Sequence, residues 1–242
     1  MSLPFFYINS IDTNTPSIVL NEETSKHIVQ VLRMQNGEQL QLTDGKGNLF
    51  TCEITDNNRK RCAVKITHTA NHQRPTTNVT IAISLLKNTN RFEWFLEKAT
   101  EIGVTEIIPL ICTRTEKQHF RHDRMNGILI SAMLQSQQTW LPVLQEPVKF
   151  ENLYHDSNRQ TQFENAQKFI AHCEDESNKV QLTSKLLNSS TSKLILIGPE
   201  GDFTKEEINL ALENNFTPVA LGNTRLRTET AGVVAAALLC IS

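Results

Sequence analysis

The chain has 242 residues, enough for one large domain or two modest ones with a real hydrophobic core. Its hydrophobic fraction of 39% and charged fraction of 21% are typical of a soluble globular protein, and no apolar run is long enough to span a membrane. A net charge of −2 argues against a protein that coats nucleic acid through bulk attraction, but it leaves room for a local basic face.

The cysteines and the N-terminus indicate the compartment. Five cysteines are scattered along the chain without a C-x-x-C pair, so neither a zinc ribbon nor a redox dithiol is indicated. The first ten residues lack the charged and apolar segments of a secretory signal. We therefore expect reduced cysteines and a cytoplasmic protein.

The first seventy or so residues predict a small β-barrel with one helix. Apolar or alternating segments predict short strands at 5–8, 39–43, 49–54 and 62–67. The sequence DGKG at 44–47 gives a hairpin turn. Residues 25–34 carry an apolar stripe at helical spacing, and Gly37 is expected to close that helix.

After a polar linker at 69–78 the pattern changes to alternating strands and helices. Strands are expected at 79–86, 104–111, 169–171, 194–197 and 218–221, and helices at 91–102, 125–134, from 204 onward, and 230–241. Gly103 is placed to cap one helix, and Thr204 with Glu207 forms a capping box at another. Such alternation predicts an α/β domain with a mainly parallel sheet.

Ligands in α/β folds bind beyond the carboxyl ends of parallel strands, and the loop GPEGD at 198–202 stands at such a place. Its glycines let a ligand approach the backbone, and its proline stiffens the loop. A plain strand–helix connection would need only the capping box that follows. The surplus residues favour a binding function.

A second loop, GNTRLRTET at 222–230, places two arginines and a glutamate between a buried strand and a buried helix. Charged groups are rarely enclosed unless they are paired or used. Glu229 could instead serve the dipole of the following helix while both arginines are solvated. That alternative leaves the R-L-R sequence unexplained.

Other familiar motifs are absent. The chain has no dinucleotide fingerprint, P-loop or nucleophile elbow. His119 and His122 lie in a polar, basic segment without a third ligand, so we expect a surface loop there and no metal site. Two basic clusters, around Arg59–Lys65 and Arg114–Arg124, fit either a solvated surface or an RNA contact.

GPEGD followed by ALGNTRLRTETA resembles the signature of the RsmE family, usually written GPEGG…LG-x-R-[IV]-LRTETA. The segments HIVQVLRMQNGEQLQLTDGKGNLF and LLKNTNRFEWFLEKATEIGVTEIIPLICTRTE are similar to other parts of the same family, so the resemblance covers the whole chain. Members belong to the SPOUT class and use S-adenosylmethionine to methylate N3 of a uridine in 16S ribosomal RNA of the small subunit.

The resemblance implies two domains: a PUA-like β-barrel that binds RNA at 1–73, and a SPOUT α/β domain at 74–242 with a C-terminal trefoil knot, an exception to unknotted topology. It further implies a homodimer, in which both chains build the active site. The knot would hold S-adenosylmethionine through Leu196, Ile197, Gly198, Pro199, Glu200, Gly201, Leu221, Gly222, Asn223, Leu226, Arg227 and Thr228.

The chain departs from the family pattern at three places. Asp202 replaces the second glycine of GPEGG, and the segment usually written A-x-E-Q-S-x-R has Leu134 and Gln138 in place of its Glu and Arg. An arginine usually found after the N-terminal proline is missing, since Phe5 follows Pro4. At positions 134 and 138 the chain therefore lacks the charges of the family pattern.

Methylation of uracil N3 requires alignment of nucleophile, methyl carbon and sulfur, together with removal of the N3 proton. Arg227 is the first candidate for stabilising charge or anchoring a phosphate, and Glu200 and Glu229 are candidates for the base or for orienting Arg227. The target base must be unstacked. Phosphates would be positioned by Arg33, Arg59, Lys60, Arg61, Arg114, Arg121 and Arg124.

Two other functions stay open. One is a SPOUT methyltransferase that acts on transfer RNA. The other is a non-catalytic RNA-binding or assembly module of the same fold, which the changes at Leu134, Gln138 and Asp202 motivate. No metal and no membrane partner is expected with any of these functions.

Overall fold

A computed structural model describes residues 3–11, 17–154, 161–174, 179–186 and 192–241. The chain divides into two compact units. The N-terminal unit comprises Met1–Arg74 and Met133–Leu141, and the C-terminal unit comprises Pro75–Ala132 and Pro142–Ser242. The return of residues 133–141 to the N-terminal unit has no signal in the sequence. The predicted domain boundary after residue 73 stays a prediction.

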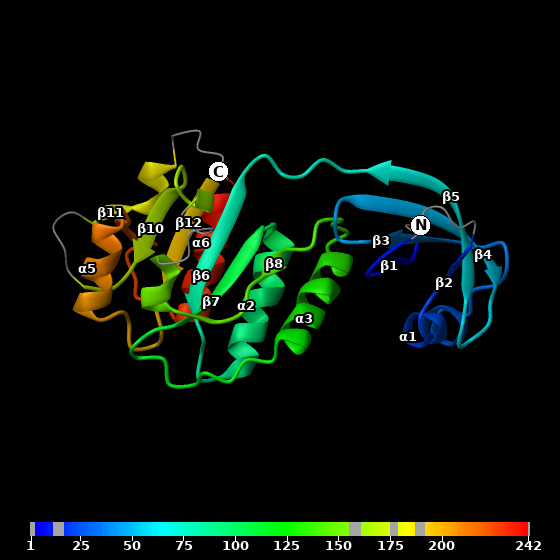
Figure 1. Ribbon diagram of the computed structural model, residues 1–242, viewed down its shortest axis with the longest axis horizontal. Coiled ribbons are helices and arrows are strands. Elements are labelled where there is room, and N and C mark those ends of the chain that lie inside the picture. The colour runs from blue at the N-terminus through cyan, green and yellow to red at the C-terminus, as the bar shows by residue number, and fades with distance from the viewer. Residues whose placement is uncertain (1–2, 12–16, 155–160, 175–178, 187–191, 242) are drawn as a thin grey trace. The chain divides into compact units, whose positions relative to one another are not determined.

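The N-terminal unit is built on a five-stranded sheet of order β1-β3-β4-β5-β2 (Figure 1). Its strands are β1 (Phe5–Tyr7), β2 (Ile18–Val19), β3 (Gln39–Thr43), β4 (Asn48–Asp56) and β5 (Ala63–Asn71). The predicted hairpin joins β3 to β4, with Gly45 and Gly47 at φ of 69° and 89°. Leu40, Leu42 and Phe50 are among the residues that form its hydrophobic core.

The predicted helix at 25–34 differs from the helix observed. Helix α1 (Glu22–Lys26) begins three residues earlier, because the side chain of Asn21 accepts a hydrogen bond from the Thr24 N–H at 2.8 Å. It continues as the π-helical turn η1 (His27–Val31). Arg33 then takes a positive φ of 57°, which ends the helix before the Gly37 that the sequence suggested.

Residues 133–141, which return to the N-terminal unit, place Trp140 against the turn between β3 and β4. The Trp140 indole N–H donates to the carbonyl of His72 at 3.1 Å, and a Cβ built on Gly47 would lie 2.7 Å from that same carbonyl oxygen. Only glycine therefore fits at position 47. Because β5 extends to Asn71 and the next strand starts at Asn78, the predicted linker shortens to 72–77.

The C-terminal unit is built on an eight-stranded sheet of order β11-β13-β10-β12-β6-β7-β8, with β9 also paired to β7. Every strand pairing described in this sheet is parallel. The strands are β6 (Asn78–Ser84), β7 (Glu106–Ile111), β8 (Val143–Leu144), β9 (Val148–Lys149), β10 (Gln167–Ala171), β11 (Val180–Gln181), β12 (Ser192–Ile197) and β13 (Thr217–Ala220).

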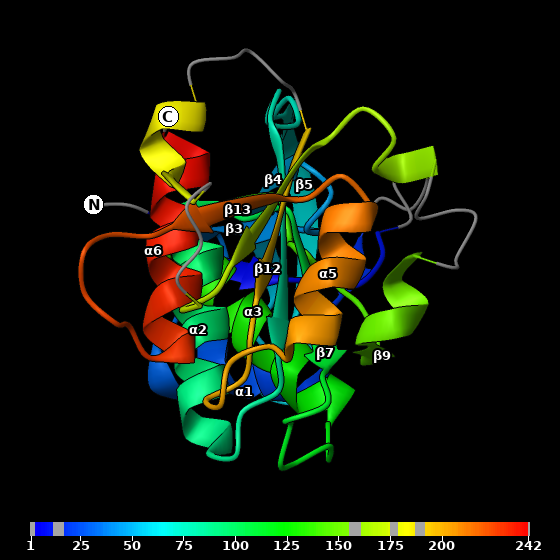
Figure 2. The ribbon, with the colours of Figure 1, turned by 90° about the vertical axis from the view of Figure 1, so that its left-hand side faces the viewer.

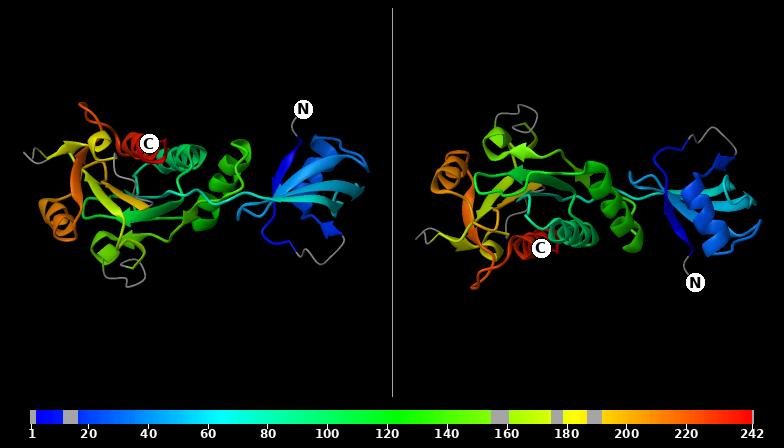
Figure 3. Two further views of the ribbon diagram at one scale, coloured as in Figure 1. Left: turned by 90° about the horizontal axis from the view of Figure 1, so that it is seen from above. Right: turned by 90° about the horizontal axis from the view of Figure 1, so that it is seen from below.

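Helices cover both faces of this sheet (Figure 2). They are α2 (Thr89–Ile102), α3 (His122–Gln135), α5 (Lys205–Glu213), α6 (Thr228–Ile241) and the 3₁₀ turns η2 (Phe150–Tyr154) and η3 (Leu182–Lys185). α6 packs on α2, β6 and β12, and Figure 3 shows α2 and α6 side by side. α5 contributes Ile208 and Ala211 to a hydrophobic cluster that also contains Phe150 and Phe203 and no residue of α2 or α6.

The predicted caps in this unit are confirmed. Gly103 has a φ of 100° and caps α2, and Thr204 and Glu207 make both hydrogen bonds of the capping box that starts α5. Among the described residues no helix is both long and apolar enough to cross a membrane. The strand pairings and helix contacts do not by themselves test the trefoil knot, which stays a prediction.

The close packing of α6 on α2 depends on Gly232. A Cβ at this position would lie 2.7 Å from the ring of the fully buried Phe95 and 2.9 Å from Ile83. We expect Gly232→Ala to lower the free energy of unfolding by roughly 1–3 kcal/mol, because the rigid ring leaves little room to adjust. Gly127, exposed within α3 with nothing within 4 Å, is the matched control.

Gly127→Ala should leave the stability unchanged or raise it by up to about 1 kcal/mol, since alanine favours a helix over glycine. Urea denaturation of both variants measures the difference. Equal effects of the two substitutions would contradict tight packing at Gly232.

Candidate functional site

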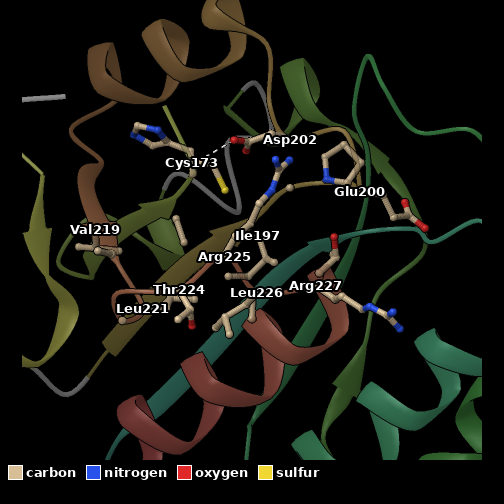
Figure 4. Close-up of a pocket in the computed structure, with 18 of the residues that line it drawn as sticks. Cys173, Ile197, Glu200, Asp202, Val219, Leu221, Thr224, Arg225, Leu226 and Arg227 are labelled. Carbon is tan, nitrogen blue, oxygen red and sulfur yellow. Dashed lines mark hydrogen bonds between the residues drawn. The ribbon is translucent and has the colours of Figure 1, made fainter. Parts of the chain in front are cut away.

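A cavity of about 590 Å³ lies at the carboxyl ends of three adjacent parallel strands, β10, β12 and β13 (Figure 4). Its walls come from the end of β10, from the loop between β12 and α5, and from the loop between β13 and α6. This volume falls within the usual range for a small-molecule site. Both loops singled out in the sequence therefore meet at one cavity.

Most residues predicted to bind the cofactor line this cavity, namely Ile197, Gly198, Pro199, Glu200, Leu221, Gly222, Asn223, Leu226, Arg227 and Thr228. Two of the predicted residues do not. Leu196 is fully buried within the core cluster that includes α5, and Gly201 is exposed beside the side chain of Arg114. The roles of all twelve stay predictions at this stage.

Arg114 holds the first loop from outside. Its guanidinium donates hydrogen bonds to the carbonyl of Gly201 at 2.6 Å and to that of Phe203 at 3.3 Å. Within the loop, the Asp202 N–H donates to the Pro199 carbonyl at 2.9 Å, which forms a tight turn. Arg114 was predicted to contact RNA. Its position gives it a structural task beside the cavity.

Asp202 connects this loop to the neighbouring strand. Its φ of 64° is in the left-handed region, where glycine is favoured, so the backbone here has a conformation that suits the glycine of GPEGG. One carboxylate oxygen accepts from the Cys173 N–H at 2.7 Å, and the other accepts from the Phe203 N–H at 2.8 Å. The aspartate therefore links the β12–α5 loop to the end of β10.

The two arginines of the second loop point in different directions. In Figure 4 the Arg225 side chain reaches toward Asp202 and Cys173, whereas the Arg227 side chain points away from them. Both line the cavity. Glu200 is exposed and accepts a hydrogen bond from the Lys87 N–H at 3.1 Å, which joins the first loop to the segment after β6.

A second hollow, of about 650 Å³, shares the lining residues of segment 225–227 with the first cavity. It is lined by Asn90, Arg91, Trp94, Arg225, Leu226, Arg227, Glu229 and Thr230. Glu229 is only 7% exposed, and its Oε1 lies 3.6 Å from Nε of Arg91. Its Oε2 is buried and has no hydrogen-bond partner in the part of the chain that the structure describes.

The remaining residues predicted to bind RNA lie outside both cavities. Arg124 is paired with Glu93 through two hydrogen bonds of 2.7 and 3.0 Å, so its charge is largely matched by a local partner. The others are exposed and form no ion pair among the described residues: Arg33, Arg59, Lys60, Arg61 and Arg121. Their contact with RNA stays a prediction.

The histidines of HFRHD do not gather a metal site. His122 Nε2 lies 3.0 Å from the carbonyl oxygen of Leu144. Across the described ranges, no three His, Cys, Asp or Glu side chains are grouped so that they could hold a metal ion.

Sequence reasoning missed part of the cavity wall. The lining residues outside the predicted cofactor set are Arg91, Ala171, His172, Cys173, Lys179, Asp202, Val219, Ala220, Thr224, Arg225 and Ala231. Arg225 could have been found, since the R-L-R sequence offered it beside Arg227. The residues after β10 could not, because the short strand at 167–171 sits in a weakly patterned stretch and reaches the site only through its parallel neighbours.

Comparison with known proteins agrees with this architecture. Residues 72–240 match the model of an RNA methyltransferase domain, and residues 20–67 match that of an RNA methyltransferase PUA domain. The chain belongs to this RNA methyltransferase family. The fold predicted for it, an α/β SPOUT domain preceded by a PUA-like domain, is confirmed at this level.

Solved members of the RNA methyltransferase family superpose over almost the whole chain. A probable rRNA methyltransferase from Porphyromonas gingivalis is 38% identical with a TM-score of 0.86, covering 97% of this chain and 95% of its own. A ribosomal RNA small subunit methyltransferase E from Neisseria gonorrhoeae, solved bound to S-adenosyl methionine, is 28% identical with a TM-score of 0.83, covering 98% and 96%.

A curated relative has the same extent. Ribosomal RNA small subunit methyltransferase E of Rickettsia conorii is 28% identical over 233 residues, which cover 96% of this chain and 92% of the relative.

The link made by Asp202 predicts an order of stability among variants. Asp202→Ala removes both hydrogen-bond acceptors and leaves a side chain at positive φ without a local partner, so unfolding free energy should fall by roughly 2 kcal/mol. Asp202→Gly removes the same acceptors but suits the backbone, so the loss should be smaller. Denaturant titration tests this order, and a larger loss for glycine would contradict it.

Cys173 should report on the electrostatics of the cavity. Partial burial raises the pKa of its thiol, and the Asp202 carboxylate raises that pKa further, so little thiolate exists at neutral pH. We expect slow alkylation of Cys173 that accelerates as pH rises, and faster alkylation in Asp202→Asn, which removes the negative charge. Peptide mass spectrometry gives the rates. An unchanged rate in Asp202→Asn would exclude this effect of Asp202.

Proposed function

We propose that this protein transfers a methyl group from S-adenosylmethionine to N3 of a uridine in 16S ribosomal RNA of the small subunit. The observation that carries the proposal is the single cavity in which the GPEGD loop and the LGNTRLRTET loop meet. Relatives named ribosomal RNA small subunit methyltransferase E, which match most of the chain, support the choice of substrate.

The cavity suits a cofactor that is part polar and part apolar. Ile197, Val219 and Leu226 supply apolar wall, and Gly222 has a φ of 136° with nothing within 4 Å of a Cβ. The backbone N–H groups of residues 223–226 donate no hydrogen bond within the described chain, so they are available to a ligand. The proposed cofactor residues are those of the predicted set that line the cavity. Bound there, S-adenosylmethionine would supply a methyl group on an electron-poor sulfur.

Among the predicted catalytic residues, the structure supports different tasks. Glu200 is exposed and engaged with the Lys87 N–H, so we assign it to shaping the loop. Arg227 lines both hollows and is placed to stabilise negative charge on a base or to hold a phosphate. Glu229 has a buried oxygen without a partner among the described residues, so it is the better candidate to accept a hydrogen bond from the N–H group of the target base.

Binding of the ribosomal RNA would extend beyond the cavities. We assign RNA contact to the domain at 1–73, through the exposed cations Arg33, Arg59, Lys60 and Arg61, and to Arg121 of the second domain. Arg114 and Arg124 have local partners and would contribute less. A homodimer and a cytoplasmic location complete the proposal, in line with the family resemblance.

The alternative of a non-catalytic module rested on altered residues, and their positions weaken it. Leu134 lies in the last turn of α3, and Gln138 lies three residues after the end of that helix, where its side chain donates to Ser136 Oγ at 2.9 Å. Neither lines the two cavities. Asp202 has a φ of 64°, a backbone conformation that glycine also adopts readily. A transfer RNA substrate stays the second candidate, and mapping of the modified base separates it from ribosomal RNA.

Calorimetry with S-adenosylmethionine, followed by labelling of undermethylated small subunits, tests the function. We expect binding of the cofactor and a label on a uridine N3 of 16S ribosomal RNA. Arg227→Ala should lower kcat/KM by roughly 10²–10³-fold with the fold intact, as for other lost donors to developing charge. Lys205→Ala, which changes an exposed cation at the start of α5, is the control. Failure of the folded protein to bind the cofactor, or a label on transfer RNA alone, would overturn the proposal.

A further inference from the structure

The second hollow contains a buried acceptor that the chain itself does not satisfy. Glu229 lies in the first turn of α6, where a carboxylate is favoured by the helix dipole. Its side chain is 9% exposed, and only Oε1 approaches a cation, Nε of Arg91 at 3.6 Å. Oε2 has no partner among the described residues. A buried carboxylate oxygen without a donor is costly, and a ligand that brings an N–H group would satisfy it.

An exposed indole forms part of the same hollow. Trp94 on α2 is 43% exposed, although its neighbours Phe92 and Phe95 on the helix are almost fully buried. An indole face open to solvent beside a hydrogen-bonding group suits a planar ring, because bases stack on aromatic side chains. Asn90, four residues earlier on α2, places an amide at the same hollow.

Positive charge surrounds this pair of groups. Arg91, Arg225 and Arg227 all line the hollow, and all three also line the first cavity. Because the Arg225 side chain reaches toward Asp202, Arg91 and Arg227 supply the positive charge of this hollow, which exceeds that of the single buried carboxylate and attracts a phosphate. The occupant that fits is therefore anionic, carries a planar ring, and presents an N–H at the ring edge.

We propose that the second hollow receives the substrate nucleotide, with its base stacked on Trp94, its ring N–H donated to Oε2 of Glu229, and its phosphate held by the arginines. This inference rests on the proposed function, and it adds the position of the base relative to the cofactor. The two hollows share Arg91, Arg225, Leu226 and Arg227, so a base in one lies beside a cofactor in the other.

A second copy of the chain is the competing occupant. An apolar helix laid over the hollow would remove three arginines and the unsatisfied Glu229 oxygen from water without supplying donors or anions. The composition of the hollow therefore favours a nucleotide.

Fluorine NMR can observe the hollow without measuring activity. The chain has two tryptophans, Trp94 and Trp140, so labelling with 5-fluorotryptophan gives two signals, and Trp94→Phe assigns them. A single-stranded oligoribonucleotide that contains one uridine is titrated into the full chain in the presence of saturating S-adenosylhomocysteine. We expect the chemical shift of the Trp94 signal to change as oligonucleotide is added and to reach a plateau when the site is saturated. Trp94→Ala should weaken oligonucleotide binding roughly tenfold, and Trp94→Phe should restore most of it.

The acceptor role of Glu229 is tested by changing the base. An oligonucleotide with 3-methyluridine lacks the ring N–H, and the wild-type protein should bind it at least about tenfold more weakly than the uridine form. Glu229→Gln keeps the size of the side chain but removes the charge, so this preference should fall to about threefold or less. Glu97→Gln, on the same α2 helix but paired with Lys98 away from the hollow, should keep the full preference.

The outcomes separate this inference from the proposed function. A shift of Trp94 and a preference for uridine without methylation would leave the base site standing and reject the proposed function. Methylation with an unmoved Trp94 signal and an unchanged preference in Glu229→Gln would overturn the base site. A Trp94 signal that follows protein concentration and ignores the oligonucleotide would assign the hollow to a second copy and would also overturn it.

Discussion

The parallel pairing of β10, β12 and β13 is the constraint on which the site depends. Ala171 on β10 is in register with both Ile197 and Val219, the residues at which the two neighbouring strands reach the cavity. Parallel strands end at the same edge of a sheet, so loops that are far apart in sequence open toward one another. A slip of one residue in β13 would exchange its two faces and withdraw Val219 from the cavity wall.

Local signals in the sequence predicted many of the strands, helices and caps of the C-terminal unit. The apolar run before Gly198, the capping box of Thr204 and Glu207, and the glycine after α2 depend on neighbours within a few residues, and each is found as expected. The cavity lining from the two loops was likewise visible, because unusual residues stood directly after buried strands.

What the sequence did not reveal depends on contacts across long separations. Arg114 acts on carbonyls that lie some ninety residues later in the chain, and no pattern around it differs from that of a solvated basic cluster. The hydrogen bond from Cys173 to Asp202 spans 29 residues, beyond the reach of local patterns, so in the sequence Asp202 looked like a lost glycine. Only the folded sheet shows that the Asp202 carboxylate joins the β12–α5 loop to the end of β10.

The links made by Arg114 and Asp202 also bear on conformational entropy. A loop that a ligand must order reduces the affinity by the freedom that the loop loses. Here the Gly201 and Phe203 carbonyls are held by a guanidinium, and the turn is joined to the end of β10 through the Asp202 carboxylate. The wall that these residues form is therefore set during folding, and a ligand meets a surface whose shape exists before it arrives.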